Sequence, residues 1–568
     1  MLVILINWLY IGITTFLTGY AVLGLFARLF EYRIRHSISY VFAGLAMVTV
    51  YAQIFSLFGG VNRLANVFLI VLCVLIYACN HKDINFLVKN TITECRIHKW
   101  RIPAFLFLIL LMAYGTSRGY MHFDTGLYHA QSIRWIEEYG VVPGLANLQA
   151  RFGYNSAAFS LTALYSMKWL VGQSLHATAG FFALLSALIA FDLYKVFTEK
   201  RICLSDFARL GLIFYLSVIF SEMMSPASDY YAQLLLFNIL ILWLDEDDYQ
   251  KKMQIQNPTP YGLLCILLVY AMTIKFSVAP LLLLVIKPMI MLLKNKDGKQ
   301  IAGCLLGGFI TALPFFIRNV LISGWLIYPS AIIDLFTVDW KIPKGQVQYD
   351  AMEIGVYGKG IRDVTQKDMP ITQWCPAWFD NLKGLEKLFV LATIIMVVSY
   401  LLYLAYIVIK RKNVDCHFTL VLSVFVVGTG FWFFTAPLVR YGYAYVVVVP
   451  AITVGYYFIQ FWESRKKKKN ADGLWKAACV VIALFLLTRV KGVCSDILRT
   501  YNEPFYIMQT DYADGEATTQ EVDGILFYVP TQGGQIGYDK FPSSIFPQPI
   551  ELRGDSIEDG FRQVDEWK

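Results

Sequence analysis

The feature that most constrains this chain is a series of long apolar runs separated by short loops rich in lysine and arginine. A helix needs about 20 mostly apolar residues to cross a hydrocarbon core of roughly 30 Å. About fourteen runs approach this length within the 568 residues, at 3–27, 39–57, 64–79, 103–116, 176–196, 207–220, 231–244, 261–272, 278–293, 301–316, 388–409, 418–434, 444–461 and 474–487. Because 57% of the chain is hydrophobic and 16% is charged, the pattern predicts an all-α polytopic membrane protein and excludes an ordinary soluble domain.

The formal net charge of +8 is concentrated in the loops between the apolar runs, which is typical of orientation signals and not of a nucleic-acid surface. The basic loops are 28–35, 82–101, 195–209, 251–252, 294–299, 410–412 and 465–469. All of them can face the cytoplasm only if an even number of crossings separates Arg101 from Lys195. Three apolar runs lie between these residues, so we expect the middle one, 157–170, to be interfacial or re-entrant against the outer surface.

This orientation predicts a transmembrane domain at 1–490, with long outer loops at 119–156 and 319–387, and an outward-facing tail at 491–568. After Lys491 the tail holds fourteen acidic and five basic residues, the reverse of the cytoplasmic loops. Its content of Gly, Pro and Asp predicts short strands and turns, and hence a small α/β or β appendage. Cys375 and Cys494 both fall on the outer side, where the sequence is compatible with a disulfide and equally with two free thiols.

Ionisable side chains gather at the outer ends of the apolar runs, where a charge is costly unless it has a partner or a function. Asp124 follows the run at 103–116 by a few residues, and Asp229 lies between two runs in SPASDYYA. Further polar residues share this depth: Lys275, Arg318, Arg440, Arg151, His129 and Tyr441. The combination of acids and cations predicts a site for an anionic lipid headgroup with a reacting alcohol beside it.

The chemistry of sugar transfer from a polyprenyl phosphate fits such a site. The leaving group is a phosphate, so cations must stabilise the charge that develops on it; Arg440 and Lys275 would do this, assisted by Arg318. The acceptor hydroxyl must lose a proton, and the Asp124 carboxylate would accept it as a general base. The lipid partner places the reaction at the outer rim of the bilayer.

Each of these residues also has a purely structural interpretation. Asp124 and Asp229 are good N-caps for the helices that begin beside them. Three of the cations could instead be simple interfacial anchors that reach lipid phosphates and have no role in catalysis: Lys275, Arg318 and Arg440. Arg151 lies in a loop where a solvated side chain is common. His129 follows Asp124 by little more than one helical turn, which favours support of Asp124 over proton transfer.

The arrangement resembles the GT-C superfamily of membrane glycosyltransferases, with an acid in the first long outer loop, a second acid between later runs, and a basic residue in a late outer loop, PLVRY. More closely, the chain resembles a family of bacterial multi-span proteins tied to surface polysaccharides. The segments that carry this resemblance are HFDTGLYHAQSIRWIEEYGVVPGLANLQARFGYNS, SPASDYY, RNVLISGWLIYPS followed by VDWKIP, and LRGDSIEDGF.

The resemblance implies that Asp124 is the catalytic base or the acceptor-binding acid, that Asp229 is the second acid, and that Arg440 binds the donor phosphate. In GT-C enzymes the first-loop acid often has an acidic neighbour. Here Phe123 and Thr125 flank Asp124. The missing acidic neighbour argues against a metal at Asp124. The sequence therefore assigns no cofactor, and a divalent metal is left as an alternative.

The leading hypothesis is a GT-C-type glycosyltransferase in a bacterial inner membrane, with its active site facing the periplasm or exterior. It would move a sugar from a polyprenyl-phosphate donor to a hydroxyl of a glycan or lipid-linked acceptor. Two alternatives remain, namely a surface-polysaccharide polymerase or ligase, and a transporter or flippase of lipid-linked glycans. The sequence has no internal repeat and its charges lie near one surface, which favours an enzyme over a transporter with charges at the midplane.

Overall fold

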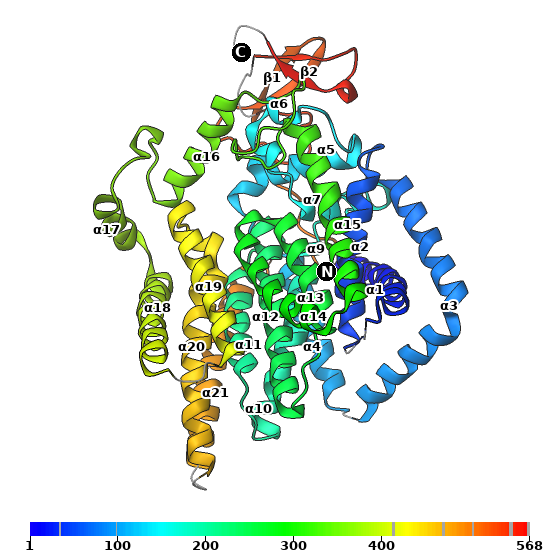
Figure 1. Ribbon diagram of the computed structural model, residues 1–568. Helices are drawn as coiled ribbons and strands as arrows, with labels where there is room; N and C mark the ends of the chain where they lie inside the picture. The colour runs from blue at the N-terminus through cyan, green and yellow to red at the C-terminus, as the bar shows by residue number, and fades with distance from the viewer. Residues whose placement is uncertain are drawn as a thin grey trace.

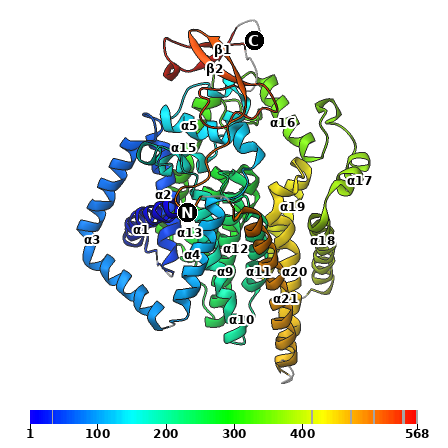
Figure 2. The same cartoon turned by 180° about the vertical axis from the view of Figure 1, so that it is seen from behind.

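The computed structural model describes residues 1–32, 34, 36–97, 99–411, 415–467, 472–502, 505–544 and 549–564. It is a mostly helical molecule in which a bundle of long helices is capped at one end by short helices and strands (Figures 1 and 2). We call this capped end the upper end, as it is drawn in Figure 1. Of the basic residues predicted to face the cytoplasm, five lie outside the described residues: Arg33, Arg35, Lys412, Lys468 and Lys469.

Within the described residues, ten helical segments are long and apolar enough to cross a membrane. They are α1 (Leu2–Phe30), α2 (Ile38–Phe55), α3 (Arg63–Ile97), α9 to α10 (Thr178–Thr198), η4 with α14 (Phe276–Asn295), α15 (Gly298–Ser323), α18 (Gly384–Lys410), α19 (Cys416–Thr435), α20 (Val439–Lys467) and α21 (Asp472–Thr500). Two shorter apolar helices are α4 (Arg101–Ser117) and α13 (Tyr261–Ile274). The predicted runs at 207–220 and 231–244 correspond to α11 (Leu204–Ile219) and α12 (Ser228–Met253). The multi-pass helical architecture is thus confirmed.

The remaining elements are short and lie mainly at the upper end of the bundle (Figure 1). The segment predicted as the first outer loop forms η1 (Thr125–His129), α5 (Ala130–Glu138), α6 (Leu145–Leu148) and η2 (Ala150–Tyr154), and it is followed by α7 (Ala157–Tyr165) and α8 (Lys168–Val171). The segment predicted as the second long outer loop forms α16 (Lys344–Gly358), η5 (Val364–Gln366) and α17 (Ile371–Asn381).

Helix α7 occupies the run that we expected to lie at the membrane surface. Its nine residues would extend only about 13 Å at about 1.5 Å per residue, which is too short to cross a bilayer. All nine are buried, and α7 packs against α2 and α5. The part of the run in α7 therefore does not span and is enclosed by protein, because α5 covers it. The end of the run, in α8, leaves Trp169 and Leu170 exposed.

Helix α12 is the centre of the bundle. Every residue from 229 to 241 is buried, and the helix packs against α9, α11, α13 and α20. An α-helix that is apolar on all sides belongs inside a bundle. The upper end of α12 begins with Ser228 and Asp229, so the predicted second acid lies at the top of this central helix.

Small residues let the first two helices pack with their backbones in contact. A Cβ atom on Gly19 would lie 1.8 Å from the carbonyl oxygen of Tyr40, and one on Gly44 would lie 1.7 Å from that of Thr15. Such close approach is typical of membrane helices, whose association depends on van der Waals contact. At the periphery, α18 and α21 leave most of their apolar surface uncovered. Only 17% of the most apolar stretch of α18 and 6% of that of α21 is buried, as expected for helices that face lipid.

The C-terminal tail forms a small β part that rests on the first outer loop. Strands β1 (Ala517–Val522) and β2 (Ile525–Pro530) make one antiparallel pair, and β3 (Ile550–Leu552) and β4 (Phe561–Gln563) make another. The Gln131 amide donates to the carbonyl oxygens of Gly537 and Lys540, at 3.0 Å each. Helix α21 continues to Thr500, beyond the boundary predicted for the tail. Cys375 and Cys494 are free thiols.

Candidate active site

Asp124 lies at the upper end of the bundle, directly before the π-helical turn η1. It occupies the N-cap position of that turn, yet its side chain makes no capping hydrogen bond. Instead, its Oδ2 accepts a hydrogen bond of 2.9 Å from Nη2 of Arg440. Within the described residues, Oδ1 of Asp124 makes no hydrogen bond or ion pair. The capping interpretation is therefore wrong for this acid, and one carboxylate oxygen is open to a ligand.

Asp229, in the first turn of α12, is paired with two cations. Its Oδ1 contacts the ammonium of Lys275, and its Oδ2 lies 3.4 Å from Nε of Arg440. The carboxylate is 7% exposed, a degree of burial that a charge tolerates only when it is paired. The positive end of the α12 dipole stabilises it further. Asp229 therefore holds Lys275 and Arg440 beside each other.

Lys275 comes from a sharp change of backbone direction between α13 and η4. It ends α13 in an extended conformation with φ −151° and ψ 124°. Its ammonium lies 4.1 Å from the centre of the Tyr441 ring, which is a cation–π distance. The turn thus brings the side chain to the same place as Arg440 and does not leave it pointing toward lipid.

Arg440 and Tyr441 form the first turn of α20, which is separated from the rest of that helix by a kink. The kink is at Gly442, with φ −124° and ψ 18°. A Cβ atom at this position would lie 2.7 Å from the Trp432 ring, so the close packing of Trp432 requires glycine here. The kink allows the guanidinium of Arg440 to turn toward Asp124 and Asp229.

His122 is a site residue that the sequence prediction missed. Its Nε2 contacts Nη1 of Arg440, and its Nδ1 lies 3.7 Å from Oδ2 of Asp124. Burial, together with the neighbouring Arg440 guanidinium, lowers the pKa of His122 below its usual range. The ring is therefore neutral at neutral pH. Its place two residues before Asp124, in HFD, is the only signal in the sequence that could have found it.

The site opens into a cavity of about 650 Å³ at the upper end of the bundle. Four predicted residues, Asp124, Lys275, Arg440 and Tyr441, line it together with Phe431 and Trp432 of α19, and a fifth, Arg151, lines it near α16. The two acids and two cations next to one another balance in charge, which lowers the cost of burying them.

Arg318 and His129 do not take the places that we predicted. Arg318 is 1% exposed and does not line the cavity. Its Nε donates a hydrogen bond of 2.9 Å to Oδ1 of Asn155, and its guanidinium also contacts the Ser56 hydroxyl. It therefore joins α15 to α2 and to the first outer loop. His129 is buried against the Phe159 ring, with ring centres 5.4 Å apart, and is also absent from the cavity lining. Both are structural because neighbouring helices cover them.

The tail holds the turn that carries Asp124. The backbone N–H groups of Ile536 and Gly537 donate to the carbonyl oxygen of Gly126 at 2.9 and 3.1 Å, and the Gln535 amide donates to that of Phe123 at 3.0 Å. Short π-helical turns occur frequently at functional sites. Here the tail supplies partners for backbone groups on both sides of Asp124.

In the part of the chain that the structure describes, no group of three or more His, Cys, Asp or Glu side chains is placed to hold a metal ion. Asp124, Asp229 and His122 each contact Arg440 through a side-chain atom.

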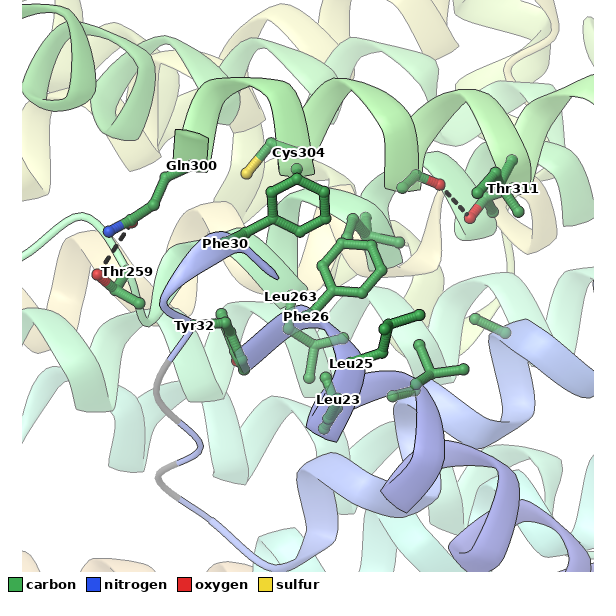
Figure 3. Close-up of a pocket in the computed structure, with 18 of the residues that line it drawn as sticks. Leu23, Leu25, Phe26, Phe30, Tyr32, Thr259, Leu263, Gln300, Cys304 and Thr311 are labelled. Atoms are coloured by element: carbon green, nitrogen blue, oxygen red, sulfur yellow. Dashed lines mark hydrogen bonds between the residues drawn. The ribbon is translucent and has the colours of Figure 1, made fainter. Parts of the chain in front are cut away.

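Two other cavities are almost entirely apolar. One, of about 610 Å³, lies between α17, α18 and α19 and shares Trp432 with the site cavity. The other, of about 190 Å³, lies between α1, α2, α13 and α15, where the Phe26 and Phe30 rings project into it (Figure 3). This second cavity shares no lining residue with the site. Of these two cavities, only the one between α17, α18 and α19 shares a lining residue with the site cavity.

Comparison with known proteins assigns the chain to a family. Residues 1–447 match the model of a family described as "Domain of unknown function (DUF8201)", which is more than half of the chain, so the protein belongs to this family. The match contains Asp124, Asp229, Lys275, Arg440 and Tyr441 and ends before the C-terminal tail. No curated protein and no solved structure matches the chain.

Proposed function

We propose that this member of the DUF8201 family is a GT-C-type glycosyltransferase of a bacterial inner membrane. It transfers a sugar from a polyprenyl-phosphate donor to a hydroxyl of a glycan or lipid-linked acceptor, on the outer face of the membrane. One observation carries the proposal. Asp124, Asp229, Lys275 and Arg440 come from four distant segments and meet at one end of an apolar helical bundle, beside a cavity of about 650 Å³.

The cations would bind the donor phosphate. Arg440 offers a planar fork and Lys275 a compact charge, which together stabilise negative charge on a departing phosphate. Without a donor, the carboxylates of Asp124 and Asp229 occupy these cations. A phosphate would compete with the carboxylates for Arg440, and this exchange would release Asp124 for its role as base.

Asp124 would act as the general base toward the acceptor hydroxyl. Its side chain is 23% exposed and lines the cavity, so an acceptor can reach it. General-base catalysis contributes about 100-fold to 10,000-fold in rate. Asp229 is more enclosed and bridges both cations, so its role is to position them.

The apolar cavity between α17, α18 and α19 suits the isoprenoid chain of the donor. Its lining comes from residues such as Val390, Ile394 and Phe433. Trp432 lines both this cavity and the site cavity. A chain lying along α18 would therefore end beside Trp432, the residue that the two cavities share.

A glycan polymerase or ligase is the second candidate, and the extent of the cavity favours it. The lining continues from Lys275 to Arg151 and Glu353, which leaves room for more than one sugar ring. Such an enzyme would use the same base and the same cations. The mass that is added to the acceptor separates the two, since a polymerase adds whole oligosaccharide units.

The test compares a deletion strain with strains that carry the wild type, Asp124→Asn or the control Asp472→Asn. Asp472 is an exposed acid at the start of α21. Mass spectrometry of envelope glycans and of polyprenyl-phosphate sugars should find a lost sugar and an accumulated donor in the deletion strain and with Asp124→Asn. The control should restore the wild-type glycan. Full restoration by Asp124→Asn, at equal protein level, would refute the assignment.

A further inference from the structure

The site cavity has a second polar end, away from Arg440, that the proposed transfer step does not use. Tyr154, Tyr328, Arg151 and Glu353 line it. They come from η2, from the segment after α15, and from α16. Arg151 and Glu353 lie 3.8 Å apart, Nη2 to Oε1, so their charges balance. This end of the cavity is therefore polar but close to neutral.

A buried acid lies behind the two tyrosines. Asp350 of α16 is 4% exposed, and its Oδ1 accepts a hydrogen bond of 3.0 Å from the Tyr154 hydroxyl. The Tyr328 phenol also lies beside it. Among the described residues, Oδ2 of Asp350 and the Tyr328 hydroxyl are buried without a hydrogen bond of normal geometry. Burial raises the pKa of Asp350 above its usual range.

The aromatic rings connect this end to the catalytic residues. The ring centres of Tyr154 and Tyr328 are 6.1 Å apart, and Tyr128 packs edge-on against Tyr154 at 5.5 Å. Tyr128 also lines the cavity, as does Asp124. Aromatic faces next to hydroxyl and carboxyl groups match a sugar ring, which has apolar C–H faces and a polar rim of hydroxyls.

We propose that the end of the cavity formed by Tyr154, Tyr328, Arg151 and Glu353 binds the acceptor as a neutral, hydroxyl-rich saccharide. This inference rests on the proposed function and assigns the acceptor class. In the transfer, the acceptor oxygen forms a bond to the anomeric carbon of the donor sugar as the bond from that carbon to the phosphate oxygen breaks. The acceptor proton passes to Asp124, and the phosphate leaves on its carrier between Arg440 and Lys275.

The test uses the full-length protein in lipid nanodiscs on an array of neutral and acidic oligosaccharides. The variants are Tyr154→Leu, Tyr328→Leu and the double variant, each of which removes an aromatic ring from the cavity lining and keeps an apolar side chain. Tyr349→Leu is the matched control, because Tyr349 lies on α16 and is 55% exposed. We expect the wild type and the control to bind a set of neutral glycans, and the double variant to lose at least about fivefold in affinity, because the sugar ring no longer has an aromatic face to pack against.

Binding by the wild type confined to acidic glycans, no binding to any array glycan, or unchanged binding by the double variant would each overturn the acceptor assignment. Asp124→Asn separates this proposal from the previous one. If that variant complements the deletion strain while array binding still depends on the two tyrosines, the transfer mechanism fails and the saccharide site stands. If Asp124→Asn abolishes sugar transfer but the double variant binds normally, the mechanism stands and the saccharide site fails.

Discussion

At the scale of single residues, Arg440 is the residue that contacts most of the other site residues. Its guanidinium lies against Asp124, Asp229 and His122 through three different nitrogen atoms. Only a planar fork can address three partners in this way, because the donors of arginine have fixed directions. The partners come from the first outer loop and from α12, so the orientation of one side chain couples segments that are more than 200 residues from it in sequence.

Arg440→Lys should therefore abolish most of the activity while preserving the fold. A lysine keeps the charge but reaches only one of the carboxylates, and we expect the transfer rate to fall by about 100-fold or more. The measurement is the rate of sugar transfer in membranes that contain equal amounts of protein. The control is Arg465→Lys, at the opposite and exposed end of α20, which should retain normal activity. A rate for Arg440→Lys within twofold of the wild type would contradict the role of the fork.

At the scale of elements, the position of η1 depends on the tail. The loop at 535–537 supplies three hydrogen bonds to the carbonyl oxygens on either side of Asp124. The tail also buries the Tyr538 hydroxyl against Glu137 of α5, and burial raises the pKa of Glu137. These outside partners therefore support the π-helical turn that follows Asp124.

Gly537→Ala should weaken this support. Gly537 has a φ of +80°, and a Cβ atom there would lie 2.2 Å from Oδ1 of Asp514 and 2.5 Å from the Ala513 carbonyl oxygen. The loop must move away from Gly126, and we expect transfer to fall severalfold while membrane insertion is unchanged. Gly524→Ala is the matched control, since Gly524 has a φ of +79° and open space around it. Both variants carry the same backbone strain of about 1 kcal/mol, so equal losses of activity in the two would contradict the role of the loop.

At the scale of the whole molecule, most of the short helices and the strands lie at one end of the bundle (Figure 1). The two long loops and the tail cover the upper end, and the site cavity opens beneath them. Along α12, Asp229 at the upper end and Lys252 at the other end are about 35 Å apart at about 1.5 Å per residue. This length fits one crossing of a bilayer, so the two ends should face opposite compartments.

Labelling of single cysteines tests this orientation. In a cysteine-free background, Thr518→Cys on β1 should react with a membrane-impermeant maleimide added to intact cells or to osmotically opened outer envelopes. Lys252→Cys should react only after the inner membrane is permeabilised. Both positions are exposed in the structure, so the difference reports the compartment. Labelling of Lys252→Cys in intact cells without labelling of Thr518→Cys would reverse the predicted orientation.

The sequence alone predicted which charged residues gather at the same ends of the apolar helices. Distance from the end of an apolar run predicts depth, and Asp124, Asp229, Lys275 and Arg440 do lie together at one end of the bundle. The helical class and the small β part of the tail were likewise predictable, because apolar length and turn residues are local properties.

Only the tertiary structure decided which residues of equal depth meet. Arg318 was predicted to share the depth of Arg440 but joins α15 to α2, and His129 lies about one turn from Asp124 but packs on Phe159. Conversely, His122 enters the site without a signal of its own, and α7 is enclosed although its run resembles an interfacial segment. The physical reason is that hydropathy reports position along the membrane normal, whereas lateral position is set by which helices pack together.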